Sequence, residues 1–197
     1  MTRLCLASHN QGKLREFRAL LEPIGFELTS MAELNLPEAE EPHVTFVENA
    51  LAKARHASRL SGLPALADDS GLCVRALNGA PGVYSARYAG EPKSDARNNE
   101  KLLTELAGKS DRHAWYTCVL VWVNEPNDPQ PIIAEGLWHG EILEAAQGDG
   151  GFGYDPLFWL SNFKQSAAEL DAAQKNGISH RGLALQDLLH KLAQRKA

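Results

Sequence analysis

The sequence predicts an α/β fold, because segments with strand character alternate with segments of helical periodicity. An apolar strand at 3–7 is followed by a helical pattern at 13–21, and a longer helical pattern covers 45–60. Two runs rich in β-branched and aromatic residues, 115–123 and 132–138, add long strands. Such a mixture is typical of a sheet covered by helices.

The first helical pattern starts after a polar turn. The residues of this turn are Ser8, His9, Asn10, Gln11, Gly12 and Lys13. In one interpretation, free N–H groups and the positive end of the helix dipole hold phosphate there, with Lys13 adding a formal charge. In the other, Ser8 or Asn10 simply caps an ordinary helix. The turn lacks the spacing of a Walker loop, so the residues alone leave both interpretations open.

The second helical pattern starts with a capping box, in which Thr45 and Glu48 are spaced to cap each other's N–H groups. Its apolar stripe consists of Phe46, Ala50, Ala54, Ala57 and Leu60. Another face carries Thr45, Asn49, Lys53 and His56. Taken alone, such a polar face is expected to be solvated surface.

A short strand at 65–67 leads into Asp68-Asp69-Ser70-Gly71, and three further carboxylates precede it at Glu38, Glu40 and Glu41. Carboxylates at a strand end suit Mg²⁺, which usually takes one or two of them together with phosphate oxygens of the substrate. Successive strand side chains point to opposite faces, so Asp68 and Asp69 are expected to do different jobs. The alternative is a turn whose side chains cap its own backbone.

A third helix is predicted at 94–106, after a turn-rich stretch. Ser166 to Glu169 has the spacing of another capping box, which predicts a helix start. The terminal helix has an apolar face made of Leu185, Leu188, Leu189 and Leu192.

The segment Gly150–Pro156 has glycines around Phe152, Tyr154 and Asp155. Glycine allows positive φ and lets a ligand approach the main chain closely. An aromatic ring there would stack on a nucleobase, a contact that contributes about 1–3 kcal/mol. We therefore interpret this segment as a ligand-binding loop, the alternative being a tight turn whose aromatic rings are buried in the core.

A cationic group lies near the carboxyl terminus, at Lys175 and in Ser179-His180-Arg181-Gly182. These side chains offer several hydrogen-bond donors, which suits the acceptor atoms of a base or a phosphate. A lone His-Arg pair is more often ordinary surface, so this group indicates a binding site only in combination with the other motifs.

Composition bounds the class of protein. The chain has 20 Lys and Arg against 25 Asp and Glu, a net charge of −5, which disfavours a protein that coats nucleic acid. With 197 residues and 44% hydrophobic content, one domain over 1–197 is expected.

No apolar run is long enough to cross a membrane and no signal peptide is evident, so a cytoplasmic location is expected. Cys5, Cys73 and Cys118 are widely spaced in apolar runs, which indicates core residues instead of a zinc or redox site.

Together these motifs resemble the Ham1-like non-canonical purine nucleoside triphosphate pyrophosphatases, also called inosine triphosphate pyrophosphatases or XTP/dITP diphosphatases. The resemblance covers almost the whole chain. It is carried by Ser8-His9-Asn10 with Lys13, Glu41, Thr45 to Ala50, Lys53-Ala54, Ala67 to Leu72, Gly79 to Arg87, Gly150 to Pro156, and Ile178 to Gly182. Two departures are small: Ser8 stands where many relatives have threonine, and Pro42-His43 replaces a pair that is often Thr-Gly or Asp-Gly.

The resemblance implies Mg²⁺-dependent hydrolysis of ITP, dITP and XTP between the α and β phosphates, which gives the monophosphate and pyrophosphate. Such an activity would remove deaminated purines from the nucleotide pool. The resemblance also implies an elongated central mixed β-sheet flanked by helices, two lobes with an active-site cleft between them, and a homodimer.

It further assigns roles to residues. Glu41 and Asp69 are expected to place Mg²⁺, with Glu38 and Glu40 as the alternatives to Glu41, and Asp69 is the candidate general base or the group that orients the attacking water. The residues expected to bind substrate are Ser8, His9, Asn10, Gln11, Gly12, Lys13, Lys53, Ser70, Phe152, Gly153, Tyr154, Asp155, Lys175, His180 and Arg181. Main-chain N–H groups of 152–155 and the His180/Arg181 pair are expected to donate to the 6-oxo group that adenine lacks.

Three other functions compete with this one. A related hydrolase would cleave the β–γ bond or prefer modified pyrimidines. A nucleotide sensor would bind without turnover, although it has less need of Asp69. A single-stranded nucleic-acid binder fits least, given the acidic balance and the absence of a basic stripe in the sequence.

Overall fold

The computed structural model describes residues 2–195, and over these residues it has one seven-stranded sheet. Its strands are β1 (Thr2–Leu6), β2 (Phe26–Ser30), β3 (Ala65–Val74), β4 (His113–Val123), β5 (Ile132–Ile142), β6 (Phe158–Leu160) and β7 (Gln165–Ser166). The strand order is β2-β1-β3-β4-β5-β6-β7. Strand β1 pairs in parallel with β2 and β3, whereas β6 pairs antiparallel with β5 and β7. The predicted α/β class with a mixed sheet is therefore confirmed.

The helices are α1 (Gln11–Leu21), α2 (Phe46–Ser61), α3 (Asp95–Glu105), α4 (Ala172–Ile178) and α5 (His180–Arg195). Four short 3-10 segments cover Glu22–Ile24, Arg75–Leu77, Gly82–Arg87 and Asp155–Leu157. In the part of the chain that the structure describes, no helix combines the length and the apolar character that a membrane span requires.

The chain divides into two compact units. The first holds the described residues of Met1–Asp69, Val119–Glu135 and Ala184–Ala197, and the second holds Ser70–Cys118 and Gly136–Leu183. Strands β3, β4 and β5 each contribute residues to both units. The prediction of a single domain over 1–197, like that of two lobes around a cleft, stays a prediction.

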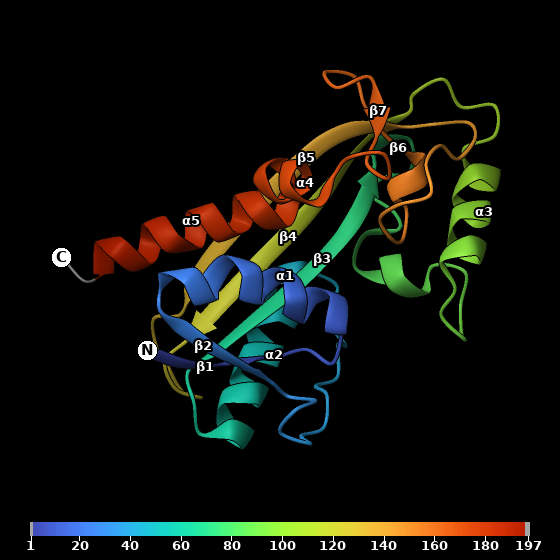
Figure 1. Cartoon of the computed structure of the whole chain (residues 1–197). Coiled ribbons are helices and arrows are strands. Elements are labelled where there is room, and N and C mark those ends of the chain that lie inside the picture. The colour runs from blue at the N-terminus through green and yellow to red at the C-terminus, as the bar shows by residue number, and fades with distance from the viewer. Residues whose placement is uncertain (1, 196–197) are drawn as a thin grey trace. The chain divides into compact units, whose positions relative to one another are not determined.

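In the first unit, helices α1 and α2 lie on opposite sides of the strands (Figure 1). Alternation along β1 explains this arrangement, because Cys5 packs into the core beneath α2 while its neighbours Leu4 and Leu6 point the other way. The core beneath α2 also contains small residues of that helix, Ala50, Ala54 and Ala57, all fully buried. Small side chains let α2 approach the sheet closely.

The second unit has its own core. Leu72 and Val74 of β3 pack there with Leu102 and Leu106 around α3, and with an aromatic group. This aromatic group consists of Tyr116, Trp138, Tyr154 and Phe158. Because the rings come from β4, β5, β6 and the preceding loop, this core fixes the loop at 150–156 against the sheet.

Most predicted helices appear close to their expected bounds. Asn10 is the N-cap of α1 and Thr45 is the N-cap of α2. The Thr45 hydroxyl accepts from the Glu48 N–H at 3.4 Å and donates to the Glu48 carboxylate at 2.5 Å, so the capping box closes through the hydroxyl. Leu60 departs from its predicted buried stripe and is 41% exposed, because it lies in the last turn of α2.

The helix start predicted at Ser166 is wrong. Ser166 belongs to β7, and its N–H donates to the Glu169 carboxylate at 2.8 Å within a turn. Helix α4 begins only at Ala172, where Asp171 caps the Gln174 N–H. The same residue spacing therefore closes a turn after a strand, because the strand already uses the backbone of Ser166.

The interpretation of the cysteines as core residues is confirmed. Cys5, Cys73 and Cys118 are all buried with free thiols. Burial raises the pKa of Cys73 to about 11, so this side chain stays protonated near neutral pH.

Candidate functional site

Strand β3 carries both aspartates in its interior. The sequence pattern predicts that this strand ends at 67, but the structure continues it to Val74, so the alternative of a turn at Asp68-Asp69 is wrong. Asp68 is bound to Lys13 of α1, with Nζ to carboxylate oxygen distances of 2.9 and 3.0 Å. Asp69 is bound instead to Lys53 of α2 at 3.0 Å. The adjacent aspartates thus have different partners, as the alternation of a strand predicts.

Lys53 joins two of the predicted metal ligands. Its Nζ lies 2.8 Å from a Glu41 oxygen and 3.0 Å from an Asp69 oxygen. Asn49, one turn earlier in α2, donates to the other Asp69 oxygen at 3.3 Å and also binds the backbone of His43. Asn49 and Lys53 are therefore buried against Asp69, and the expectation that this polar helix face is solvated is wrong for both.

These side chains form a cluster with an excess of negative charge, which we call the acidic–lysine cluster: Lys13, Glu41, Lys53, Asp68 and Asp69. Burial raises the pKa of Asp69, and the charges of Glu41 and Asp68 add to this, so that together they outweigh Lys53. Burial acts to lower the pKa of Lys53, but Asp69, Asp68 and Glu41 outweigh it and the net shift is upward. Three carboxylates thus share two ammonium groups, and an added cation would relieve their repulsion.

The donor set of this cluster fits Mg²⁺. Glu41 and Asp69 already converge on one cationic atom, Lys53 Nζ, and both present oxygen ligands. Of the alternatives to Glu41, Glu38 lies near His9, with 3.9 Å between their nearest atoms. Among residues 2–195, no group of three or more His, Cys, Asp or Glu side chains is arranged to hold a metal ion. That is the usual situation for Mg²⁺, which takes one or two carboxylates and completes its shell with water and substrate phosphate.

The turn at 8–13 is a capped helix start. Asn10 Oδ1 accepts from the N–H groups of Gly12 and Lys13 at 2.8 and 3.1 Å, and Ser8 Oγ accepts from the Asn10 N–H at 3.1 Å. Three of the N–H groups that were candidates for binding phosphate, those of Asn10, Gly12 and Lys13, are therefore already bonded. His9 and Gln11 are exposed beside them, and His9 Nε2 lies 2.8 Å from the Leu36 carbonyl oxygen.

In the second unit, the loop at 150–156 presents an exposed aromatic ring. Phe152 is 51% exposed, and Lys175 Nζ lies over its ring at 4.7 Å from the centroid. Lys175 also binds the buried carboxylate of Asp155 at 2.5 Å. Gly151 has φ +71°, and a Cβ there would overlap the Asp155 carboxylate, so only glycine fits this position. The loop is thus neither a simple turn nor a core segment, since Phe152 faces solvent while Tyr154 and Asp155 are buried.

The main-chain donors of this loop are already used. The N–H of Phe152 donates to Asp155 at 2.8 Å, that of Gly153 to Asp95 at 2.9 Å, and that of Asp155 to the Phe152 carbonyl at 3.2 Å. The backbone of Tyr154 bonds the Tyr116 phenol oxygen. The expectation that these N–H groups read a base is therefore not met by this structure, because each stabilises the loop itself.

His180 and Arg181 are buried at the start of α5, with exposures of 5% and 6%, in contrast to an ordinary surface pair. The His180 ring stacks on Tyr116 at 4.7 Å with an interplanar angle of 11°. Arg181 Cζ lies 5.9 Å from the Phe152 ring centroid. The next residue is Gly182, where a Cβ would overlap the Asn176 carbonyl. The absence of a side chain at this position lets α4 and α5 join tightly. The structure therefore brings Phe152, Lys175 and Arg181 together.

Several residues of these groups have contacts that the sequence does not predict. Asn49 stands on a polar face with the right spacing, which was the available signal. Asp68 had no predicted role, and nothing in the sequence pairs it with Lys13. No sequence pattern predicted the contacts of Tyr116 and Asp95 with the loop at 150–156, because these contacts join segments far apart in the chain. Ser70, a predicted substrate ligand, lies half-buried in β3 next to Asp69.

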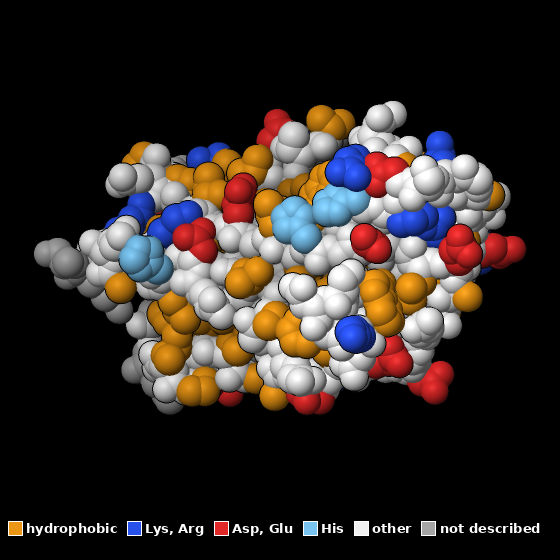
Figure 2. Space-filling view, turned by 90° about the horizontal axis from the view of Figure 1, so that it is seen from above, with side chains coloured by type: hydrophobic (Ala, Val, Ile, Leu, Met, Phe, Trp, Pro, Cys, Tyr) orange, Lys and Arg blue, Asp and Glu red, His pale blue; other side chains and the backbone are white. Residues whose placement is uncertain are grey.

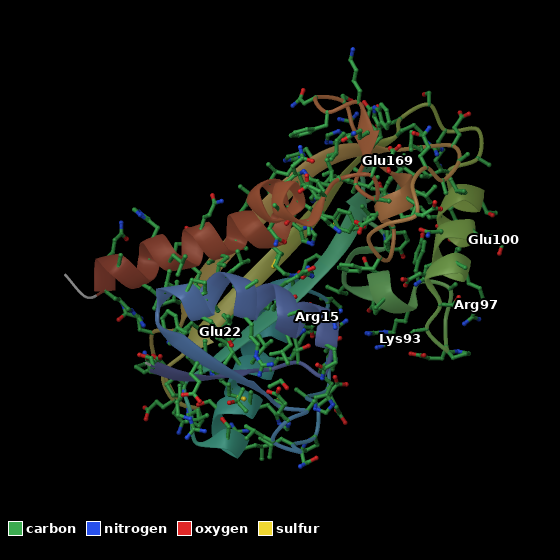
Figure 3. All side chains as sticks on the ribbon, in the orientation of Figure 1. Arg15, Glu22, Lys93, Arg97, Glu100 and Glu169 are labelled. Atoms are coloured by element: carbon green, nitrogen blue, oxygen red, sulfur yellow. The ribbon has the colours of Figure 1, made fainter. Side chains whose placement is uncertain are left out.

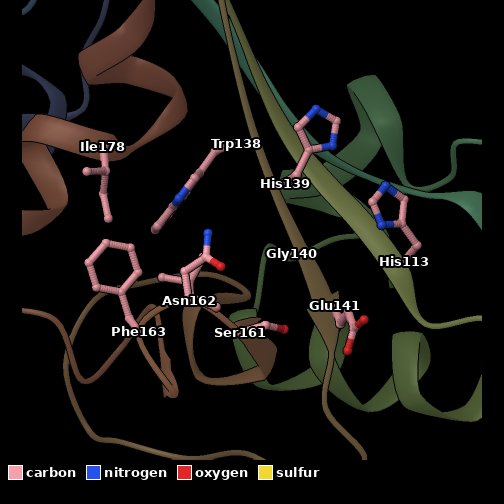
Figure 4. Close-up of a pocket in the computed structure, with 10 residues that line it drawn as sticks. His113, Trp138, His139, Gly140, Glu141, Ser161, Asn162, Phe163 and Ile178 are labelled. Atoms are coloured by element: carbon pink, nitrogen blue, oxygen red, sulfur yellow. The ribbon is translucent and has the colours of Figure 1, made fainter.

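The second unit also has a surface pocket of about 380 Å³ (Figure 4). Its lining includes Trp138, Phe163 and Ile178 with His113, His139 and Glu141. The rings of His113 and His139 stack at 5.6 Å. None of the predicted site residues is among its lining residues.

Comparison with known proteins identifies the family. The model of the Ham1 family matches residues 4–191, almost the entire chain. The chain belongs to the Ham1 family. The resemblance inferred from separated motifs is thereby confirmed.

Relatives in the Ham1 family include a dITP/XTP pyrophosphatase of Ralstonia nicotianae, 64% identical over 195 residues, which are 98% of this chain and 97% of the relative. A dITP/XTP pyrophosphatase of Chromobacterium violaceum is 61% identical over 96% of each chain. Among solved structures, a HAM1 protein from Coxiella burnetii is 48% identical with a TM-score of 0.93, covering 98% of this chain and 100% of its own. The fold is accordingly that of Ham1 proteins.

Removal of the Lys53 ammonium tests the acidic–lysine cluster. Lys53→Met leaves Asp69 buried beside Glu41 and Asp68 without its cation, and we expect a loss of about 3–5 kcal/mol in the free energy of unfolding. The measurement is urea denaturation without nucleotide or metal. Asp69→Asn in the same chain should recover part of the loss, since it removes the uncompensated charge.

The matched control is Lys191→Met, because Lys191 pairs with Asp187 one turn away on α5 and both side chains are more exposed. There we expect a loss of about 0.3–0.5 kcal/mol. Equal losses for the two variants would mean that burial does not distinguish the cluster from a surface ion pair.

Proposed function

We propose that this protein is a nucleoside triphosphate pyrophosphatase that hydrolyses dITP, XTP and ITP to the monophosphate and pyrophosphate, with Mg²⁺ as cofactor. Membership of the Ham1 family and relatives named dITP/XTP pyrophosphatase support this enzyme class and these substrates. The observation that carries the proposal is the convergence of Glu41 and Asp69 on Lys53. A buried aspartate and a half-buried glutamate, with lysines beside them, suit the phosphates and metal of a nucleotide.

In this proposal the acidic–lysine cluster and the turn at 8–13 bind the triphosphate. Lys13 and Lys53 oppose its negative charge, and the turn at 8–13 lies at the start of α1, whose dipole also favours anions. Glu41 and Asp69 would hold Mg²⁺, which, when bound, supplies positive charge beside the phosphate oxygens and lowers the pKa of the attacking water. Of the predicted candidates, Glu41 is preferred to Glu38 and Glu40 because only its contact with Lys53 places it beside Asp69.

The reaction itself requires little covalent chemistry from the protein. A water oxygen bonds to the α-phosphorus while the bond from that phosphorus to the bridging oxygen breaks, and pyrophosphate leaves with the electron pair. Asp69 accepts the water proton or orients the water through a hydrogen bond. A carboxylate bound directly to Mg²⁺ is a poor proton acceptor, so Asp69 would orient the water when it holds the metal and would accept the proton only when it does not.

The loop at 150–156 and the start of α5 bind the base in this proposal. Phe152 offers a stacking face, Lys175 and Arg181 offer side-chain donors near its ring, and His180 precedes Arg181 in α5. Because the N–H groups of the loop are already bonded, we assign recognition of the 6-oxo group to these side chains. Adenine presents an amino donor at that position, so donor would face donor, a mismatch that costs about 1–3 kcal/mol for each buried group.

A nucleic-acid binder remains the weakest alternative. On the face that Figure 2 shows, the basic side chains are interspersed with acidic ones and form no continuous stripe. A positively charged track is what single-strand binding requires. The homodimer and the cytoplasmic location stay predictions.

The function is tested by incubating the protein with dITP, XTP, dATP or dGTP and measuring pyrophosphate and orthophosphate separately. We expect pyrophosphate from dITP and XTP, little product from dATP or dGTP, and loss of activity with EDTA that added Mg²⁺ restores. Orthophosphate as the first product would indicate β–γ cleavage, and equal rates on all four nucleotides would contradict the proposed base recognition.

Asp69→Asn separates the enzyme from a sensor. The amide keeps the shape of the side chain but removes its charge and basicity, so we expect the hydrolysis rate to fall about 10²–10⁴-fold. Nucleotide binding, measured by calorimetry with dITP, should remain detectable. Unchanged turnover in this variant would remove Asp69 from the reaction.

Arg181→Ala tests the assignment of base recognition to side chains. We expect the ratio of kcat/KM for dITP over dATP to fall by about tenfold, the equivalent of one lost hydrogen bond to a charged group. Activity on dITP itself should fall less than it would if Arg181 bound phosphate. A uniform loss on every triphosphate would assign Arg181 to phosphate binding instead.

A further inference from the structure

We propose that Asp95 and Asn99 of α3 are positioning residues that fix Gly153, and with it the exposed ring of Phe152, in the conformation that receives the nucleobase. This inference rests on the proposed function, because it gives the loop at 150–156 a base to receive. It extends that function to a helix that contributes none of the predicted site residues.

The contacts involve both main-chain groups of Gly153. Its N–H donates to Asp95 Oδ2 at 2.9 Å, and its carbonyl accepts from Asn99 Nδ2 at 3.0 Å. Asp95 and Asn99 are four residues apart, so one face of α3 presents a carboxylate and an amide together. This face thus binds the donor and the acceptor of one residue, an arrangement we call the Gly153 clamp.

The loop needs such external support. Residues 150, 151 and 153 are glycines, and Gly151 and Gly153 both have positive φ, so the segment has a large conformational entropy when it is unrestrained. Inside the loop, the Phe152 N–H reaches only Asp155, three residues later. The clamp acts on the residue immediately after Phe152, where it limits the rotation of the backbone that aims the ring.

Helix α3 is well placed to serve as the support. Leu102 is fully buried in the core of the second unit, and Asn98 is 2% exposed. Asn98 donates to the carbonyls of Ser85 and Ala86, at 3.3 and 3.2 Å. The Ser85 carbonyl also accepts from the Tyr154 hydroxyl at 2.8 Å. The loop is therefore held at Gly153 by α3 and at Tyr154 by the segment to which α3 is itself bonded.

Holding the loop this way has a direct effect on substrate binding. Ordering a free loop opposes binding, whereas a loop that is already ordered offers its stacking face without that cost. The clamp also keeps the Gly153 N–H from the base, because this N–H already donates a hydrogen bond to Asp95. Loss of the clamp should therefore raise KM more than it lowers kcat, since the reacting phosphates are bound by other residues.

The test compares four variants of the full chain. Asp95→Ala removes the acceptor for the Gly153 N–H, while Asp95→Asn keeps an amide oxygen that can still accept it. Asn99→Ala removes the donor to the carbonyl. Glu100→Ala is the control, because Glu100 lies on the outer side of α3 and points away from the ribbon (Figure 3).

Amide hydrogen exchange of the loop, without nucleotide, reports on the clamp directly. We expect exchange at Gly153 to become about tenfold faster in Asp95→Ala, as for the loss of one hydrogen bond to a charged acceptor, and to stay near the wild-type rate in Asp95→Asn and Glu100→Ala. Steady-state hydrolysis of dITP should show KM raised about tenfold in Asp95→Ala, a smaller rise in Asn99→Ala, and recovery in Asp95→Asn.

The two readouts separate the possible failures. Unchanged exchange in Asp95→Ala overturns the clamp even where the wild type hydrolyses dITP. Faster exchange with unchanged KM overturns the positioning role and leaves a structural hydrogen bond. If exchange is faster in Asp95→Ala but the wild-type protein hydrolyses none of the four nucleotides, the proposed function is overturned and the clamp is retained.

Discussion

The ammonium group of Lys53 lies 2.8 Å from Glu41 and 3.0 Å from Asp69, and this contact constrains much of the first unit. It requires α2 to cross β3 at the level of Asp69, with Asn49 one turn away on the same carboxylate. It also holds the connection between β2 and α2 near β3, because Glu41 belongs to that connection. A buried carboxylate without such a partner would be costly, so the geometry of the site and the packing of this helix depend on the same ions.

In the second unit, hydrogen bonds hold the glycine-rich loop at 150–156 in one conformation. Its peptide groups are bonded to side chains of the loop, to α3 and to the Tyr116 phenol. Burial of His180 against Tyr116 gives the start of α5 a rigid backing. The N–H groups of 152–155 are all bonded within the protein, and for this reason the proposed recognition of a base is assigned to side chains.

The sequence predicted the class of fold, the helix bounds and the family, since these depend on local periodicity and on short motifs. It failed where one pattern serves two purposes: the spacing of Ser166 and Glu169 closes a turn after β7 as readily as it starts a helix. The polar helix face, taken alone, also indicated solvated surface for Asn49 and Lys53, because burial depends on which strand the helix covers; only the family resemblance assigned Lys53 to the site. The contacts of Asp95 and Tyr116 with the loop at 150–156 join distant segments, and no local pattern encodes them.

The buried thiols have a consequence for the conditions under which this protein can work. Only the thiolate reacts readily with peroxides and nitrosating agents, and with a pKa of about 11 the Cys73 side chain is ionised in roughly one molecule in ten thousand at pH 7. Cys5 and Cys118 are fully shielded from solvent. Reactive nitrogen and oxygen species also deaminate and oxidise purines. Under the function proposed above, this arrangement keeps the protein's own sulfur unreactive in the conditions that damage nucleotides.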